Sequence, residues 1–402
     1  MVCWLKSCIL IYKIMNKDEK KVILFALPDF RGGGAERVFL NLINNISSDL
    51  FEVHVAVGKF QGAYHKDLSD QVYLHELGSI KFINSIFPMA RLIWHIKPNI
   101  VLSTLGYVVS SSLVSLFSPK KVVFVSRFGN TASSFLEEIK KNSKIRYYLQ
   151  YILNKSVFYL SDLVIVQSNH MSQDLTSTFK LKDKYLRKVI QINNPVAFEA
   201  INLSAKLDVF SKDFNKIFKN NFVFVSVGRL ESRKNYKSLL IAFKSVNQIY
   251  PETRLIILGE GESRPYLESF IAKNEIDDFV KLPGFIANPG AIVSKSDFFI
   301  SSSLYEGVSN AILESLALGI PVIATDCPSG IKDVITDGEN GYLVNINGDI
   351  IKNLSEKMLF VVSENNNNNF LKISQKILED FDINVIVKKY ESILLQLLSR
   401  KK

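Results

Sequence analysis

The sequence predicts an α/β protein that consists of two doubly wound domains, each with a parallel sheet between layers of helices. Two series of short, β-branched apolar segments alternate with amphipathic stretches of helical length. Continuous apolar segments are typical of strands that are buried on both faces, and their alternation with helices is typical of parallel sheets. The 402 residues also exceed what one hydrophobic core usually organises, so we expect two domains of ordinary size.

Each half of the chain contains five predicted strands. Those of the first half are residues 22–27, 53–57, 100–104, 122–126 and 163–167. Those of the second half are residues 222–227, 254–258, 279–282, 297–301 and 321–325. The segment between the two series breaks strand periodicity at Pro195 and then becomes polar and charged, so we expect the domain boundary between residues 200 and 218.

The two ends of the chain lie outside these strand series. Residues 1–14 contain a short apolar stretch without a small-residue cleavage site, and a start at Met15 would lead directly into the first strand, so we interpret them as an extension. The Asn run at residues 365–369 predicts a surface loop, and residues 383–398 have the periodicity of an amphipathic helix. These patterns divide the chain into residues 1–14, 15–205, 206–380 and 381–402.

The composition indicates a basic, folded protein. Lysine and arginine outnumber acidic residues by 49 to 39, for a formal net charge of +10. This excess favours an anionic partner, and it is equally compatible with charge that only maintains solubility. Cys3, Cys8 and Cys327 have no metal-ligand spacing and cannot form a complete disulfide framework, which favours the cytoplasm. No segment has the roughly 18 uninterrupted apolar residues of a membrane-spanning helix.

A glycine-rich turn follows the first predicted strand, in the segment DFRGGGAERVFLNLI. Gly32, Gly33 and Gly34 precede the apolar periodicity of a helix. Consecutive glycines allow a backbone to approach a phosphate or sugar closely, and a helix N-terminus supplies unpaired N–H groups. Such a turn can also serve strand-to-helix geometry alone, and its spacing is not that of the dinucleotide motif.

A basic loop follows the first strand of the second half, in the segment VGRLESRKNYKSLLIAF. Arg229 and Lys234 are five positions apart, where they can converge on two phosphates. Arg233 and Lys237 are further cations of the same segment. A surface loop with no ligand is the alternative interpretation of this motif by itself.

The segment SSSLYEGVSNAILESLALGIPVIATD contains the strongest candidate site. Glu306 is expected in the loop at the carboxyl end of a strand, and Glu314 about one turn into the following helix. Carboxylates accept hydrogen bonds from hydroxyl pairs, such as those of a sugar and of a ribose. The helix N-terminus between the two glutamates is suited to a diphosphate, and it comprises Gly307, Val308, Ser309 and Asn310.

These motifs, in this order, resemble the family 4 glycosyltransferases of the GT-B fold. The resemblance covers nearly the whole chain and includes the segments GGGAER, SDLVIVQSN, INNPV, VGRLESRKN, LGEGESRPYLE, LPGF and the two glutamates of E-x7-E. It implies two Rossmann-like domains that face a central cleft. Residues 15–205 would bind the acceptor, residues 206–380 the nucleotide sugar, and the helix in 381–402 would return to the N-terminal domain.

The resemblance also implies roles for the motif residues. Arg229 and Lys234 would bind the donor diphosphate, Glu306 the sugar hydroxyls and Glu314 the ribose. The backbone at Gly284 and Phe285 would contact the base, and Gly33 and Gly34 would also contact the donor. Such enzymes retain the anomeric configuration and usually work without a metal, and they use no cofactor besides the nucleotide sugar. We therefore expect Arg229, Lys234 and the helix N-terminus to stabilise the departing nucleoside diphosphate.

One segment of the first half departs from the family pattern. Many relatives have a histidine after the fourth or fifth strand, whereas this chain reads VSRFGNTA, with Phe128 near the expected position. We assign Arg127 and Asn130 to the acceptor side on this basis.

The following segment, FLEEIKKNSKIRYYLQYILNKSVFYL, combines aromatic and aliphatic residues with several cations. These cations are Lys140, Lys141, Lys144, Arg146 and Lys155. A basic, aromatic-rich helix is suited to an anionic bilayer, whereas an ordinary amphipathic helix would pack on its own domain. We expect peripheral association with the cytoplasmic membrane face and an acceptor on a polyprenyl-diphosphate carrier.

Two other functional interpretations remain at this level. A GT-B epimerase or hydrolase would bind the same nucleotide sugar, expected to be a UDP-linked hexose or N-acetylhexosamine, and would act without an acceptor. A binding module for nucleic acid or membrane would rest on the positive charge alone, and the sequence contains no recognised nucleic-acid motif.

Overall fold

The computed structural model describes residues 20–206, 212–364 and 375–401. The predicted extension at residues 1–14 and the Asn run at 365–369 lie outside these ranges. The chain divides into two compact units. The first comprises the residues up to Pro195 together with those from Ile383 onward, and the second comprises Val196–Asp382.

The first unit is built on a seven-stranded parallel sheet with the order β3-β2-β1-β4-β5-β6-β7. Its strands are β1 (Lys21–Leu27), β2 (Phe51–Val57), β3 (Tyr73–Glu76), β4 (Ile100–Thr104), β5 (Val123–Arg127), β6 (Leu163–Val166) and β7 (Val189–Gln191). The five predicted strands are present, and the central ones are buried on both faces as expected. The edge strands β3 and β7 are not predicted, because the side chains of β3 are largely exposed and β7 is only three residues long.

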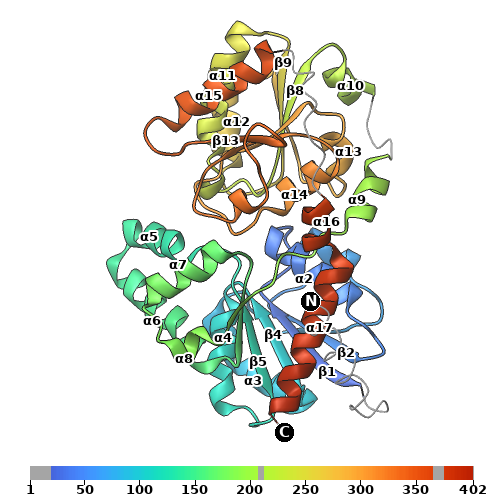
Figure 1. The fold of residues 1–402 in the computed structure, drawn as a ribbon, viewed down its shortest axis with the longest axis vertical. Coiled ribbons are helices and arrows are strands. Elements are labelled where there is room, and N and C mark those ends of the chain that lie inside the picture. The colour runs from blue at the N-terminus through green and yellow to red at the C-terminus, as the bar shows by residue number, and fades with distance from the viewer. Residues whose placement is uncertain (1–19, 207–211, 365–374, 402) are drawn as a thin grey trace. The chain divides into compact units, whose positions relative to one another are not determined.

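Helices cover both faces of this sheet (Figure 1). They are α2 (Gly34–Asn45), α3 (Phe82–Ile96), α4 (Tyr107–Val114), α5 (Ala132–Asn142), α6 (Lys144–Leu160), α7 (Asn169–Phe179), α8 (Asp183–Leu186) and α17 (Ile383–Arg400), with the 3-10 segments η1 (Ala63–Asp67) and η2 (Ser115–Phe117). The C-terminal helix α17 packs on α2, and Glu391 accepts a hydrogen bond from the Ser47 backbone at 2.7 Å. The predicted return of this helix to the N-terminal unit is confirmed.

The basic aromatic segment after β5 forms two helices rather than the single helix that its composition suggested. The break falls at Ser143, where α5 ends, and the Ser143 hydroxyl accepts a hydrogen bond from the Arg146 backbone at 3.3 Å. Serine is a favourable N-cap residue, so it starts a new helix here. None of the helices in the described residues is both long and apolar enough to cross a membrane.

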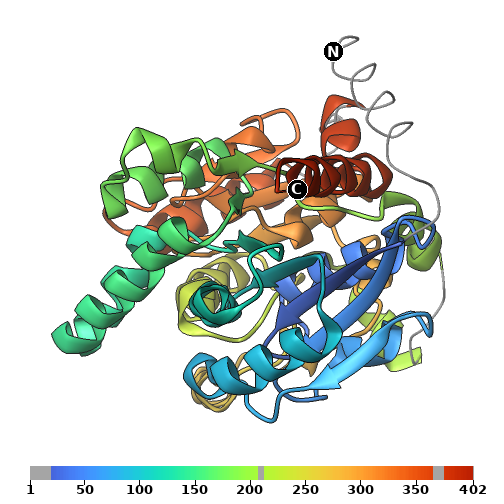
Figure 2. The ribbon, with the colours of Figure 1, turned by 90° about the horizontal axis from the view of Figure 1, so that it is seen from below.

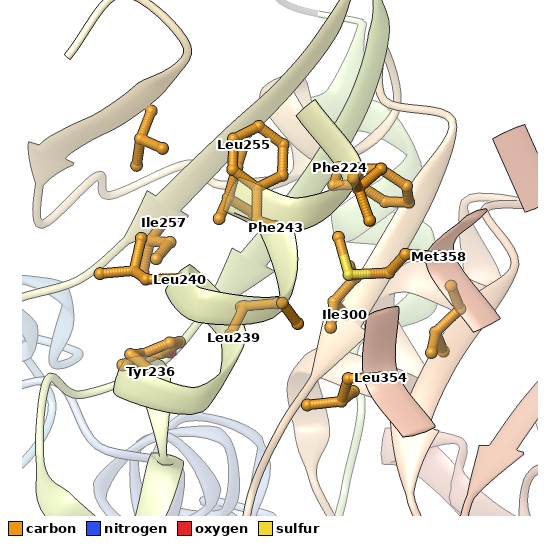
Figure 3. Packing of buried hydrophobic residues seen from close by; sticks show 14 of the residues in the cluster. Phe224, Tyr236, Leu239, Leu240, Phe243, Leu255, Ile257, Ile300, Leu354 and Met358 are labelled. Carbon is orange, nitrogen blue, oxygen red and sulfur yellow. The ribbon is translucent and has the colours of Figure 1, made fainter. Parts of the chain in front are cut away.

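The second unit contains a six-stranded parallel sheet with the order β10-β9-β8-β11-β12-β13. Its strands are β8 (Phe222–Val227), β9 (Thr253–Leu258), β10 (Val280–Gly284), β11 (Phe298–Ser301), β12 (Val322–Thr325) and β13 (Gly341–Val344). The five predicted strands are present again, and β13 is additional. One face of this sheet packs on two helices through Phe224, Leu240, Phe243 and Met358 (Figure 3).

The helices of the second unit fill both faces of its sheet. They are α9 (Phe198–Ala205), α10 (Lys212–Asn215), α11 (Tyr236–Ile249), α12 (Arg264–Lys273), α13 (Gly290–Val293), α14 (Asn310–Ala317), α15 (Ile350–Ser363) and α16 (Gln375–Phe381), with η3 (Lys216–Phe218), η4 (Ser232–Lys234) and η5 (Ile331–Asp333). Residues 198–205, which the sequence placed in the first domain, form α9 of this unit. Phe198 and Ile201 of α9 are buried in a cluster with Ile292 and Leu313, so apolar packing holds α9 here.

Candidate functional site

The candidate site of the second unit lies where two loops leave adjacent strands. β8 and β11 are neighbours in the sheet although they are far apart in sequence, and the order of strands reverses between them. Ligands of open α/β sheets bind at the carboxyl ends of strands at such a switch point. The loop after β8 contains Arg229 and Lys234, and the loop after β11 contains Glu306. The topology therefore brings the two strongest sequence motifs to one edge of one sheet.

A buried carboxylate joins the two loops. Glu306 is only 9% exposed, and one of its oxygens forms an ion pair with the Lys234 ammonium. Its other oxygen lies 2.9 Å from the Arg233 guanidinium, which also pairs with Glu231. The Ser303 hydroxyl donates a hydrogen bond to Glu306 at 2.9 Å. Two cations and a hydroxyl thus hold one carboxylate in a fixed position.

Hydrogen bonds between the loop backbones reinforce this arrangement. The Ser302 hydroxyl donates to the Lys234 carbonyl at 2.8 Å, and the Leu304 N–H donates to the Arg233 carbonyl at 2.8 Å. The Thr325 hydroxyl, at the end of β12, donates to the Ser303 carbonyl at 2.5 Å. The backbones that carry the charged groups are therefore connected to each other and to a third strand.

The charges around Glu306 determine its protonation. Burial raises the pKa of a carboxyl group, but the nearby Lys234 and Arg233 outweigh burial and lower the pKa of Glu306 to about 2. The same contacts raise the pKa of the Arg233 guanidinium against the opposing effect of its burial. Glu306 is consequently ionised throughout the physiological pH range. Burial also raises the pKa of the neighbouring Cys327 thiol to about 11, so this cysteine is neutral.

Small residues make room for the Lys234 side chain. A Cβ atom added at Gly228 would lie 2.9 Å from the Tyr236 hydroxyl and 3.0 Å from Cε of Lys234. A Cβ atom at Gly259 would lie 2.0 Å from the Gly228 carbonyl, and Gly259 has a φ of +146°. The glycines of the VGR and LGEG segments thus allow the two loops to pack against each other.

We expect Gly228→Ala to reduce activity at least about tenfold, because the new methyl group would displace the Lys234 ammonium from its position. The measurement is kcat/KM with the donor that the screen described below selects. The samples are compared at equal concentrations of folded protein. Gly348→Ala is the control, because it adds the same methyl group to another glycine of this unit. It is expected to lower stability, since Gly348 has a φ of +79°, without a comparable loss of kcat/KM. Equal kcat/KM losses in the two variants would contradict the role of Gly228 in placing Lys234.

The segment after Glu306 forms the predicted turn and helix. Ser309 occupies the N-cap position of α14, and its side chain makes no capping hydrogen bond. Val308 is buried in the apolar cluster beneath, so any contact with a ligand would come from its backbone. Asn310 begins the helix, and Glu314 lies one turn further on and is half-buried.

The LPGF segment lies at the end of β10. Gly284 has a φ of +92°, which favours glycine, and its carbonyl accepts a hydrogen bond from Gly259 at 2.8 Å. A Cβ atom at Gly284 would lie 2.7 Å from a Glu260 side-chain oxygen. Phe285, the last residue of this segment, is 36% exposed. Arg229, which belongs to the loop after β8, is half-buried.

The remaining predicted site residues belong to the first unit. Gly33 is the N-cap residue of α2 and Gly34 begins that helix, so the expected turn from strand to helix is present. No atom lies within 4 Å of the position that a Cβ of Gly34 would occupy. Asn130 is half-buried in the loop between β5 and α5.

Arg127, which we assign to the acceptor side, is the last residue of β5 and is 0% exposed. Its guanidinium donates a hydrogen bond to the Asn194 side chain, and it lies close enough to Tyr390 of α17 for the two groups to affect each other's pKa. Burial lowers the pKa of Arg127. The buried side chain thus contacts Asn194 in the first unit, and its assignment to the acceptor side stays a prediction.

Two contributors to the site had not been predicted. Arg233 had been set beside Lys237 as an ambiguous surface cation, yet Arg233 pairs with Glu306 while Lys237 is exposed on α11. Ser303 donates to the same carboxylate, and its only sequence signal is the run of small polar residues SSS at the end of β11.

Comparisons with known proteins place this geometry in a family. Residues 210–376 match the model of the glycosyl transferases group 1. The chain is 31% identical over 270 residues to an uncharacterized glycosyltransferase of Methanocaldococcus jannaschii, which covers 64% of this chain and 63% of that protein. It therefore spans slightly less than two thirds of the length of this relative.

Two further matches extend over more of the chain. It is 29% identical over 326 residues to the N-acetylgalactosamine-N,N'-diacetylbacillosaminyl-diphospho-undecaprenol 4-alpha-N-acetylgalactosaminyltransferase of Campylobacter jejuni, which covers 79% of this chain and 84% of that protein. The fold is similar to that of an Anabaena protein crystallised with UDP-glucose, with a TM-score of 0.75 and 17% identity over 94% of this chain and 99% of that chain.

Proposed function

Because the chain belongs to the group 1 (family 4) glycosyltransferases, we propose that it moves a hexose or N-acetylhexosamine from a UDP-linked donor to a hydroxyl of a growing, lipid-linked surface glycan, with retention of configuration. The observation that carries the proposal is the buried Glu306 carboxylate between Lys234 and Arg233, at the switch point of the second sheet. This site combines acceptors for sugar hydroxyls with cations for phosphates.

Donor binding would exchange the partners inside this site. Lys234, Arg229 and Arg233 would bind the diphosphate. The Glu306 carboxylate would accept hydrogen bonds from the sugar hydroxyls. Glu314 would contact the ribose, and the backbone at Gly284 and Phe285 would contact the base.

The same cations would then promote the reaction. When the glycosidic bond breaks, negative charge accumulates on the departing UDP. Lys234 and Arg229 would stabilise that charge, together with the N–H groups at the start of α14. The interaction strengthens as the bond breaks, so it lowers the barrier rather than only tightening donor binding.

The acceptor part of the proposal rests on the relatives and on one surface of the first unit. The Campylobacter relative is named for an undecaprenyl-diphosphate-linked acceptor. In this chain, α6 exposes Ile145, Tyr148, Leu149 and Ile152 along one helical face, with Ile145 83% exposed. Exposed cations border this stripe. We infer that α6 binds the cytoplasmic face of an anionic membrane, where a polyprenyl-diphosphate acceptor would be found.

A donor screen followed by turnover measurements tests the proposed function. We expect UDP-sugars, and not GDP-sugars, to raise the melting temperature, since a ligand at a hundredfold excess over its Kd adds about 2.7 kcal/mol of stability. UDP release from the stabilising donor is then measured with and without a polyprenyl-diphosphate-linked glycan acceptor. Release that requires the acceptor supports the transferase.

The alternatives give different results in the same experiment. Fast turnover of the donor without acceptor would indicate an epimerase or hydrolase. Stabilisation by GDP-sugars alone would contradict the proposed base. Absence of stabilisation by any sugar nucleotide would contradict the proposed donor site.

A further inference from the structure

A second group of exposed apolar side chains lies on the first unit, on elements other than α6. Phe87 is 78% exposed, Phe117 68%, Leu116 and Ile83 59% each, and Trp94 54%. Large apolar patches on a protein surface often mark interaction sites. We call these five residues the α3–η2 patch.

The residues of the patch lie on one face of α3 and on the adjacent η2. Ile83, Phe87 and Trp94 are separated by four and seven positions on α3, so they share one helical face. The opposite side of α3 is buried through Met89 and Ile93. The Trp94 indole N–H donates a hydrogen bond of 3.0 Å to the Phe117 carbonyl, which fixes η2 against this face.

The segment that carries the patch has charges of a single sign. No aspartate or glutamate occurs between Glu76 and Glu137, a segment that contains all of α3 and η2. Within that segment the exposed charged residues are Lys81, Arg91, Lys97, Lys120 and Lys121. An apolar, aromatic face whose own segment carries only cations complements the headgroups and upper acyl region of an anionic bilayer. Tryptophan is enriched at that boundary because one part of its ring is apolar and its N–H is polar.

The patch also lies in the same helix layer as α6. α4 packs against both α3 and α6, and Ser115 of η2 donates a hydrogen bond to the Leu160 carbonyl at the end of α6. Figures 1 and 2 show α3, α4 and α6 on one side of the first sheet and α17 on the other. The exposed residues of α3 and of α6 lie opposite the buried side of their own helix, so both point away from the sheet.

We propose that the α3–η2 patch is a second membrane contact, which inserts Phe87, Trp94 and Phe117 into an anionic bilayer while α6 binds beside it. The inference rests on the proposed membrane association and extends it from one helix to a two-part surface. Two separate contacts fix the orientation of the first unit on a membrane, whereas a single helix leaves it free to rotate about that helix.

The experiment is vesicle flotation of the full chain. Its probes are vesicles of phosphatidylglycerol with phosphatidylethanolamine, and vesicles of phosphatidylcholine alone. Three double variants are compared: Phe87→Ser with Phe117→Ser in the patch, Tyr148→Ser with Ile152→Ser in α6, and Leu203→Ser with Ile249→Ser as the control. Leu203 and Ile249 are 67% and 59% exposed in the second unit, so the control removes similar apolar surface elsewhere.

We expect the wild type to bind the anionic vesicles and each first-unit variant to lose at least about tenfold in partition coefficient. The control should bind as the wild type does. Circular dichroism and turnover in detergent, with a short-chain acceptor, check that each variant is folded and active. These readouts do not depend on vesicles, so a failure of the proposed catalytic function is seen separately.

Three outcomes would overturn the inference. The patch variant binds like the wild type while the α6 variant does not, which leaves α6 as the membrane contact. The wild type binds neither kind of vesicle, which also removes the membrane association proposed above. The patch variant changes from dimer to monomer in light scattering without a change in vesicle binding, which shows that a second copy covers this face.

Discussion

Replacing Glu306 with alanine is expected to lower kcat/KM by about a hundredfold to a thousandfold. The substitution removes the carboxylate that would bind the sugar hydroxyls. It also releases Lys234 and Arg233, which Glu306 holds in place. The loss should appear in kcat as well as KM, because the cations would no longer be positioned for the departing diphosphate. The measurement is steady-state kinetics with the donor and acceptor that the screen and turnover experiment described above select.

Glu268→Ala is the matched control for the loss of a carboxylate. Glu268 lies on α12 of the same unit and forms a surface ion pair with Arg264 at 2.8 Å. Surface pairs of this kind contribute little to stability, so we expect near-wild-type kinetics. A folded Glu306→Ala protein with wild-type rates would contradict the proposed site.

Glu306 also makes a pH-dependent contribution to stability. Its pKa is about 2 in the folded protein and 4.5 for an ordinary glutamate, so the ionised form favours folding. The contribution is complete above about pH 4.5 and is lost as the pH falls towards 2. The difference in urea midpoint between the wild type and Glu306→Gln should therefore be constant from pH 8 to 5 and shrink below that range. A difference that grows on acidification would contradict the depressed pKa.

Replacing Lys234 with alanine is the second substitution with a large expected effect. We expect kcat/KM to fall by about a hundredfold to a thousandfold, because the buried ammonium would balance charge on the departing diphosphate. Lys234→Ala also leaves Glu306 with Arg233 as its remaining ion-pair partner, so the thermal stability should fall as well. Kinetics and melting temperatures with and without UDP provide both readouts.

The chain offers a close control three positions away. Lys237 lies on the exposed face of α11, where its ammonium is 5.6 Å from the Tyr266 ring centroid. Lys237→Ala removes the same charge from the same segment without reaching Glu306, so its kinetics and its response to UDP should be unchanged. If both lysine variants lost activity equally, the general charge of the loop rather than the position of Lys234 would be responsible.

Much of the fold could be predicted from the sequence, because buried parallel strands appear in it as short apolar segments. The central strands of both sheets fall where VILFAL, IVLST and FVFVSV predicted them, and the family that the motifs indicated is confirmed. The edge strand β3 was not predictable in this way, since Tyr73 and Leu74 are 56% and 45% exposed. The break at Ser143 was not predicted, because the composition of a segment indicates that it is helical but does not locate where a helix ends.

The candidate site was predictable in part for a similar reason. Glu306 and Lys234 are 72 positions apart, yet each follows a recognisable strand, and adjacent strands bring them together. The sequence did not indicate which neighbouring cation turns towards the carboxylate, because that depends on the geometry of η4. The burial of Arg127 was not predictable, because its neighbours include Asn194 and Tyr390 of the distant helix α17, and contacts of such long range leave no local pattern.

The ion pairs of Glu306 have a consequence for selectivity among the many phosphate compounds of a cell. The cations that would bind the donor are partly neutralised by the protein's own carboxylate before any ligand arrives. Inorganic phosphate would have to separate these charges and would leave the buried Glu306 carboxylate with the Ser303 hydroxyl as its remaining partner. A sugar nucleotide brings hydroxyl groups to the carboxylate as well as phosphates to the cations. In the proposed function, this charge balance would disfavour anions that bring no hydroxyl groups to Glu306, independently of the shape of the sugar or base.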